Sequence, residues 1–142
     1  MRETEDDLRA EREILTDLAI RWRCNWRKLG NGGKYRIDAV LEREREIMMW
    51  VEVKDYSHDR FVGMNIPKYM EGCQLAALTG HPFYQIIRVD GRLGIVRIHD
   101  GLTSMAPPKY MIAGGTPVGR EPLPDDIEPM AMFDKSLIRW LG

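Results

Sequence analysis

The stretch YRIDAVLEREREIMMWVEVK, residues 35–54, decides the fold that this sequence predicts. Apolar and polar residues alternate on both sides of a charged centre, which is typical of strands with one buried face. The alternation predicts one strand over residues 35–41 and a second over residues 47–54. Because only the charged residues 42–46 connect them, the two strands are expected to form an antiparallel hairpin.

The hairpin is expected to bring two carboxylates together on one face of the sheet. Glu52 and Lys54 are two residues apart, so both project from the same side of their strand. If Glu42 opposes Met48, the numbers of paired residues add up to 90. Asp38 then lies directly opposite Glu52. A shift of the pairing by one residue would turn every side chain to the other face, and the apolar alternation argues against it.

Carboxylates this close together repel each other and lose hydration. A divalent cation, Mg²⁺ or Mn²⁺, would offset both costs. Asp38, Glu52 and the backbone carbonyl of Val53 are therefore predicted to bind metal. Lys54 is predicted to neutralise charge on a phosphate or to orient an attacking water. The alternative is a structural salt bridge between Lys54 and one of the two acids on an exposed sheet face.

A first helix is predicted from Glu5 to about Arg23, and it contains one further candidate ligand. Its apolar residues recur at spacings of three, four and seven and form one stripe along the helix. Glu11 falls inside this stripe, and it would join the metal site if the helix packed against the carboxylate face. The alternative is a side chain that reaches solvent from the edge of the stripe. The stripe consists of Leu8, Leu15, Leu18, Ala19 and Trp22.

The remaining elements are predicted from periodicity and turn signals. Pro67 suits the start of a helix that continues to about Leu78, and Asp90-Gly91 suits a tight turn between two strands. Residues 106–126 are rich in Pro and Gly and are expected to form a loop. Together the elements predict one α/β domain over residues 1–142, with helices flanking a central mixed β-sheet. The other expected elements are strands over Phe83–Val89 and Leu93–His99, a short strand over Lys109–Ile112, and a short C-terminal helix over Phe133–Leu141 capped by Asp134.

Several residues near the hairpin are candidate contacts for nucleic acid. Lys68 and Tyr69 lie in the first turn of the predicted second helix, where a phosphate is favoured. Gln74 lies further along the same helix, and Lys34 and Arg36 would extend the basic surface. For each of these residues the alternative is an ordinary structural or surface role.

Composition narrows the class of protein. A hydrophobic fraction of 44% and a charged fraction of 30% are typical of a soluble globular chain. The formal net charge of −1 means that any attraction for phosphate must come from a local patch. Cys24 and Cys73 form no CxxC pair, so reduced thiols are expected rather than a zinc site or a disulfide. No apolar run could cross a bilayer and the N-terminus lacks a secretory signal, which predicts a cytoplasmic location.

The pattern of Asp38, thirteen residues and then Glu52-Val53-Lys54 resembles the PD-(D/E)XK nuclease superfamily. The resemblance implies a restriction-endonuclease-like core, in which the two acids bind Mg²⁺ or Mn²⁺ and the lysine assists catalysis. A glutamate on the first helix, here Glu11, often completes such a site. The residue before Asp38 is isoleucine, where the superfamily pattern has proline. Among members, the chain most resembles small stand-alone nucleases of the phage type or of the Holliday-junction-resolvase type.

The residues and the resemblance together predict a metal-dependent nuclease that hydrolyses phosphodiester bonds, with DNA as the expected substrate. A homodimer would suit an enzyme that cuts two strands, and a partner protein could direct it. Two other readings of the sequence stay open. One is a non-catalytic nucleic-acid-binding or assembly protein that keeps the nuclease fold. The other is a small scaffold whose acidic hairpin binds a structural cation.

Overall fold

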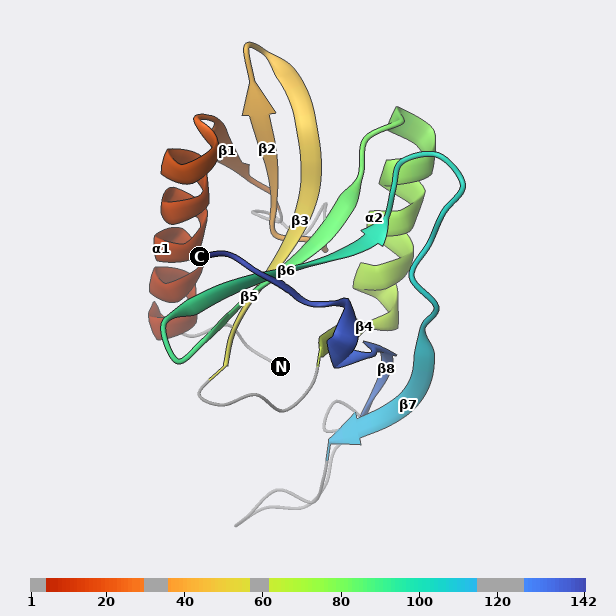
Figure 1. The fold of residues 1–142 in the computed structure, drawn as a ribbon. Coiled ribbons are helices and arrows are strands. Elements are labelled where there is room, and N and C mark those ends of the chain that lie inside the picture. The colour runs from red at the N-terminus through yellow and green to blue at the C-terminus, as the bar shows by residue number, and fades with distance from the viewer. Residues whose placement is uncertain (1–4, 30–35, 57–61, 115–126) are drawn as a thin grey trace.

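Two β-sheets and two α-helices make up the residues described by a computed structural model, 5–29, 36–56, 62–114 and 127–142 (Figure 1). The main sheet has the strand order β1-β2-β3-β5-β6-β9, and the second sheet has the order β4-β8-β7. The helices are α1 (Glu5–Trp22) and α2 (Ile66–Thr79), and a 3-10 turn, η2 (Lys135–Leu137), precedes the last strand. The strands are β1 (Asn25–Lys28), β2 (Ala39–Arg43), β3 (Glu46–Tyr56), β4 (Val62–Asn65), β5 (Phe83–Val89), β6 (Arg92–His99), β7 (Lys109–Gly114), β8 (Ile127–Phe133) and β9 (Arg139–Trp140).

The main sheet is mixed, as predicted. β3 pairs with β2 antiparallel and with β5 parallel. Parallel neighbours need a crossover connection, and here the chain passes from β3 through β4 and α2 before it returns as β5. The crossover therefore places α2 directly after the strand that carries Glu52.

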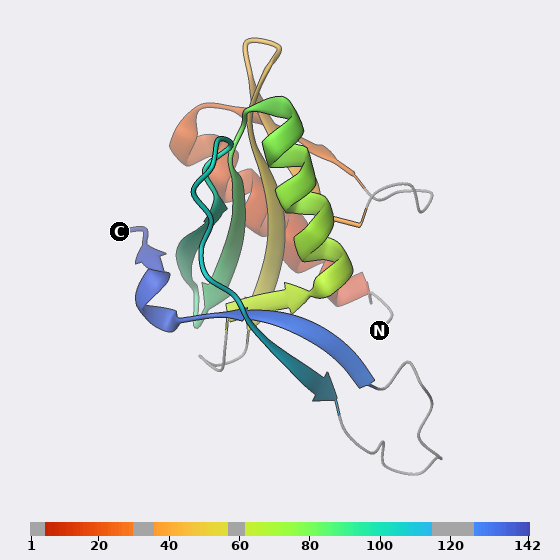
Figure 2. The same ribbon diagram turned by 90° about the vertical axis from the view of Figure 1, so that its right-hand side faces the viewer.

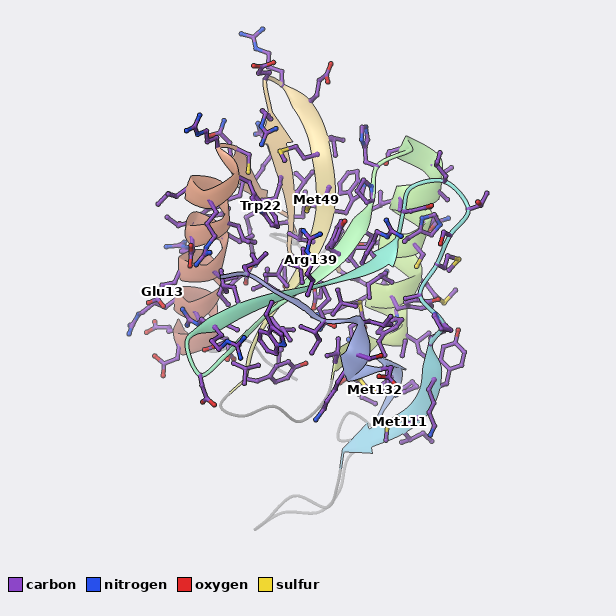
Figure 3. All side chains as sticks on the ribbon, in the orientation of Figure 1. Glu13, Trp22, Met49, Met111, Met132 and Arg139 are labelled. Carbon is purple, nitrogen blue, oxygen red and sulfur yellow. The ribbon has the colours of Figure 1, made fainter. Side chains whose placement is uncertain are left out.

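The two helices cover opposite faces of the main sheet (Figure 1). On one face, α1 buries Ile14, Leu15 and Leu18 in a cluster that includes Val51 and Val53 of β3. On the other face, α2 packs into a separate cluster, which Trp50 of the same strand joins. Alternate residues of β3 thus face different helices, as the pleat of a strand requires. Side chains fill both of these layers (Figure 3).

Local sequence explains why α2 begins and ends where it does. The Asn65 side chain accepts a hydrogen bond from the Lys68 backbone N–H at 2.9 Å, and Pro67 occupies the first turn. Gly80 ends the helix with φ 73°, a left-handed conformation that glycine adopts without strain. Gly72 lies so close to the Phe83 ring that an added Cβ would overlap it. The helix therefore sits directly on β5.

Four strands, β1, β4, β8 and β9, were not predicted from the sequence. β1 and β4 have four residues each, too few for alternation to stand out. β8 contains Pro129, which counts against a strand in sequence reasoning, yet it forms the middle strand of the second sheet. β7 and β8 lie side by side and extend away from the main sheet (Figure 2). The short strand predicted at the start of β7 is confirmed.

The predicted C-terminal helix over Phe133–Leu141 is wrong. Asp134 does act as a cap and accepts a hydrogen bond from the Ser136 backbone N–H, but only a single 3-10 turn follows. The chain then pairs with β6 as β9, through Gly94 opposite Trp140. Pairing with the sheet edge therefore replaces a second helical turn. No helix in the described part of the chain is both long and apolar enough to cross a membrane.

Candidate active site

The hairpin of β2 and β3 brings Asp38 and Glu52 together as predicted. Ala39 pairs with Val51 and Val40 with Trp50, and both sums of residue numbers are 90. Asp38 lies one residue before β2, opposite Glu52 in this register. Farther out the register shifts between Leu41 and Glu42, so Glu42 opposes Ile47 and not the predicted Met48. This bulge is compensated by a shorter turn and leaves the pairing near the two acids unchanged.

Asp38 is held in place by the strand that carries Glu52. The Val53 backbone N–H donates to Asp38 Oδ2 at 2.7 Å, and Asp38 is only 6% exposed. The N–H and C=O groups of one residue point to the same side of a strand. The Val53 carbonyl is therefore on the edge of β3 that Asp38 occupies.

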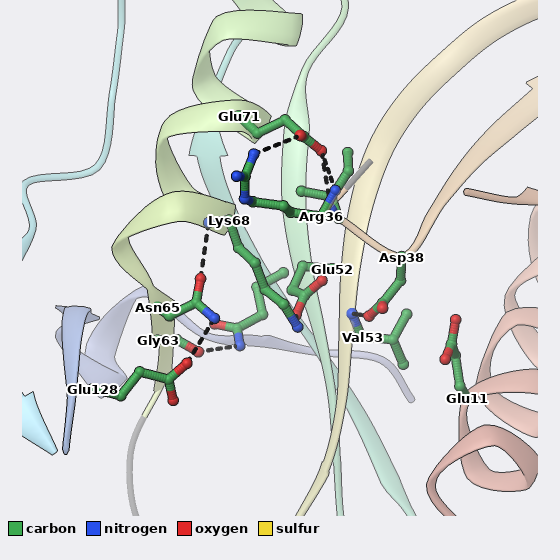
Figure 4. A network of polar contacts seen from close by, with 12 residues as sticks. Glu11, Arg36, Asp38, Glu52, Val53, Gly63, Asn65, Lys68, Glu71 and Glu128 are labelled. Atoms are coloured by element: carbon green, nitrogen blue, oxygen red, sulfur yellow. Dashed lines mark hydrogen bonds and ion pairs between the residues drawn. The ribbon is translucent and has the colours of Figure 1, made fainter. Parts of the chain in front are cut away.

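Glu52 is a buried carboxylate with one ammonium partner. Lys68 Nζ lies 2.8 Å from Glu52 Oε2, whereas Oε1 has no hydrogen-bond partner among the described residues (Figure 4). Burial raises the pKa of Glu52 well above its ordinary value, and the negative charge of Asp38 raises it further. Lys68 opposes both effects without cancelling them.

Lys54 occupies an exposed position two residues beyond Glu52. Its ammonium lies 6.0 Å from the centroid of the Tyr56 ring. No ion pair between Lys54 and either acid occurs within the described ranges, so the predicted alternative of a structural salt bridge is not what the structure shows. The positive charge next to Glu52 is the ammonium group of Lys68, which belongs to α2.

Glu11 reaches this region from the other side of the sheet. The helix that carries it packs on the face opposite the one that α2 covers, which differs from the packing considered from the sequence. Its carboxylate is 6% exposed and points toward Asp38 and Val53 (Figure 4). Lys28 of β1 lies 2.5 Å from Glu11 Oε1 and balances its charge. Glu11 is therefore a buried, paired carboxylate and does not reach solvent from the stripe edge.

The residues predicted to contact nucleic acid differ in their burial in the structure. Tyr69 is a core residue, 6% exposed, with its ring against Phe133, and this burial corrects the expectation that it contacts DNA. Gln74 is exposed on α2, and Arg36 is exposed beside Glu71. Lys34 lies outside the described residues.

Two polar residues that the sequence did not single out support the site. Glu71 of α2 accepts hydrogen bonds from the backbone N–H groups of Arg36 and Ile37, at 2.7 and 3.1 Å, just before Asp38 (Figure 4). Gln85 pairs directly with Glu52 and donates from Nε2 to the Gly63 carbonyl at 2.6 Å. A glutamine inside the apolar strand β5 was a usable signal, because buried polar residues are uncommon. Glu71 gave no such signal.

The donor set fits a divalent cation. Glu52 Oε1 is a buried oxygen with no partner in the described residues, and the Asp38 carboxylate lies next to it. Both carboxylates and the Val53 carbonyl offer the hard oxygen ligands that Mg²⁺ and Mn²⁺ accept. Within the described ranges no three His, Cys, Asp or Glu side chains form a closed cation cage. With two carboxylates and one backbone oxygen as ligands, a cation would keep coordination positions for water and for a phosphate oxygen.

Comparisons with known proteins agree with this geometry. No curated protein matches the sequence. Among solved structures, the chain is similar to Archaeoglobus fulgidus Hjc, a Holliday junction resolvase from an archaeal hyperthermophile. The TM-score is 0.50 at 13% sequence identity, and the match covers 88% of this chain and 84% of that one, which supports the restriction-endonuclease-like fold. A family model described as "Phage putative PDDEXK endonuclease" matches residues 1–141, and the chain therefore belongs to this PD-(D/E)XK family.

Proposed function

We propose that this chain is a nuclease that hydrolyses phosphodiester bonds in DNA with the help of Mg²⁺ or Mn²⁺. The observation that carries the proposal is the buried pair of Asp38 and Glu52, in which one oxygen of Glu52 lacks a partner within the described chain. Two neighbouring buried carboxylates whose charge Lys68 compensates only in part are costly unless a further cation binds there. Membership in an endonuclease family supports the same chemistry.

Each candidate residue has a role in this proposal. Asp38, Glu52 and the Val53 carbonyl would hold the cation, and Glu11 would support Asp38 from the α1 side. A divalent cation at these oxygens would activate a water molecule and stabilise the negative charge that develops on the phosphate. Lys54, exposed two residues beyond Glu52 on β3, would donate a hydrogen bond to the phosphate or to the attacking water.

Branched DNA is the first substrate to test, because the chain shares its fold with a Holliday junction resolvase. We further propose that residues 1–142 act as one nuclease domain and that two copies, or one copy with a partner protein, cut paired strands. A cytoplasmic location belongs to the same proposal, since the expected substrate is DNA.

The direct test is a cleavage assay with supercoiled plasmid and a four-way junction, with Mn²⁺ or with EDTA. We expect Mn²⁺-dependent cutting by the wild-type chain and by Lys109→Ala, a substitution on the second sheet. Asp38→Ala and Lys54→Ala should each reduce the rate by about 10²-fold or more. Wild-type protein that binds DNA without cutting it would instead support a non-catalytic nucleic-acid-binding role.

A further inference from the structure

The lysine that contacts the candidate metal site comes from a helix and not from the strand motif. Lys68 Nζ lies 2.8 Å from Glu52 Oε2, and the two side chains are 30% and 6% exposed. Lysine has a flexible four-carbon stem, so this partly exposed ammonium can leave the carboxylate without rearrangement of the backbone. Glu52 is fixed inside the sheet and cannot follow it.

A divalent cation and Lys68 would compete for the same carboxylate. Two positive charges beside one oxygen repel each other, and the repulsion is strong where burial lowers the effective dielectric. The Oε2 atom is a natural ligand once Oε1 is engaged, since carboxylates bind divalent cations through one or both oxygens. Binding of the cation should therefore weaken the Lys68–Glu52 pair.

The position of Lys68 also indicates where its ammonium would go. Lys68 lies in the first turn of α2, which has 14 residues and carries no acidic side chain in that turn. The start of a helix favours anions, and a lysine there adds a full positive charge. In a nuclease the anion beside the metal ligands is a phosphate of the substrate.

We propose that Lys68 holds Glu52 while the divalent cation is absent, and that metal binding transfers the Lys68 ammonium to a phosphate of the nucleic acid. This inference rests on the proposed nuclease function. It makes Lys68 a substrate-binding residue that becomes available only when the metal has bound, so that the unloaded site has little affinity for phosphate through this residue.

The first test measures metal binding without DNA. Free Mn²⁺ is counted by electron paramagnetic resonance for wild type, Lys68→Met and the matched control Lys109→Met, at a pH where the wild-type affinity has reached its plateau. Lys68→Met should bind Mn²⁺ about three- to tenfold more tightly, because the cation no longer displaces an ammonium. The control should match wild type. Equal or weaker binding by Lys68→Met would overturn the competition.

The second test measures single-turnover cleavage of DNA at saturating Mn²⁺. Lys68→Met should be slower by about 10²-fold although its metal site is full, since a phosphate ligand is missing. A wild-type rate in this variant would overturn the transfer to phosphate. A slow rate that recovers as more Mn²⁺ is added would show that Lys68 merely builds the metal site, and would overturn it as well.

A third measurement needs no substitution in the measured protein. Lysine labelled with ¹³C at the ε-carbon reports each ammonium environment by NMR, and the Lys68 signal is identified from its loss in Lys68→Arg. Addition of Mg²⁺ should move this signal to the position of exposed lysines, and an unmoved signal would overturn the proposal. If wild type cuts no DNA, the nuclease function and the transfer to phosphate both fail, while the NMR result still decides the displacement.

Discussion

Inside the sheet, Glu52 has lost most of its hydration and faces a second carboxylate. Lys68 compensates only part of this cost, because one ammonium serves one of the two Glu52 oxygens. Buried charges that are incompletely paired usually reduce stability. We therefore expect Glu52, a proposed metal ligand, to be unfavourable for folding.

Replacement of this carboxyl group tests that cost. The raised pKa means that the native chain holds the Glu52 proton more tightly than the unfolded chain does. The free energy of unfolding should therefore fall as pH rises from the ordinary value of 4.5 through the raised native pKa. Glu52→Gln should remove this part of the pH dependence and should add about 1–2 kcal/mol of stability above the raised native pKa.

Urea denaturation of wild type and Glu52→Gln across this pH range provides the measurement. Asp38→Asn is a useful companion, because loss of the neighbouring charge should lower the pKa of Glu52 and flatten the wild-type slope. Parallel pH profiles for wild type and Glu52→Gln would show that Glu52 is not the group responsible.

The pairing of Asp38 with Glu52 could be predicted from the sequence, because both residues lie in one hairpin, where pairing follows from local alternation. The side chains that contact these two acids could not be predicted. Lys68 and Glu71 come from α2, and their contacts with Glu52 and with Ile37 depend on how that helix packs on the sheet. Lys68 was predicted near a phosphate, but its contact with Glu52 required the fold.

Helix α2 controls the site through two contacts on successive turns. Lys68 holds Glu52, and Glu71, three residues later, holds the backbone that leads into Asp38. Residues three apart lie on the same side of a helix, so one helix face contacts both Glu52 and the backbone that leads into Asp38, the two proposed metal ligands. A small shift of α2 would disturb both acids together.

Glu71→Ala tests the second of these contacts. Two backbone N–H groups would lose a charged acceptor, at a cost of about 1–3 kcal/mol. We expect faster hydrogen exchange at the Arg36 and Ile37 amides and a severalfold slower cleavage rate. Glu71→Gln keeps one carbonyl oxygen and should lie between wild type and Glu71→Ala. Unchanged exchange at these amides would mean that Glu71 does not restrain the segment.

Helices and strands with a clear hydrophobic periodicity, or with Pro or Gly residues at their ends, were predicted well. α1, α2, β5 and β6 begin and end within about two residues of the expected positions, because apolar stripes, Pro67 and Asp90-Gly91 mark them. β1 and β4 escaped detection because four residues are too few for alternation to show, and each strand forms only through pairing with a neighbouring strand. The C-terminal segment failed for the same reason, since an edge of the sheet was available to it.

On the scale of the whole molecule, a hydrogen bond connects the two sheets next to the site. Gln85 of the main sheet donates to the Gly63 carbonyl of β4 at 2.6 Å, and within the second sheet Asn65 of β4 donates to Glu128 of β8 at 2.9 Å. β4 is also the segment that leads from β3 to α2. Binding of a cation at Glu52 should therefore stabilise the fold as a whole.

Thermal unfolding with and without Mn²⁺ measures this coupling. A ligand that binds only the folded chain adds about 2.7 kcal/mol at a hundredfold excess over its Kd, which should raise the Tm by several degrees. EDTA should reverse the increase, and Asp38→Ala should not show it. An equal increase in wild type and Asp38→Ala would indicate that the ion binds elsewhere.

The contact between Gly72 and the Phe83 ring sets the height of α2 above β5. Even one methyl group at this position would lift the helix, and Lys68 and Glu71 would rise with it. Gly72, which has no side chain, thus sets the distance between α2 and the sheet at the candidate site. In a saturation library selected for DNA cutting, position 72 should accept no replacement, because every side chain there would overlap the Phe83 ring.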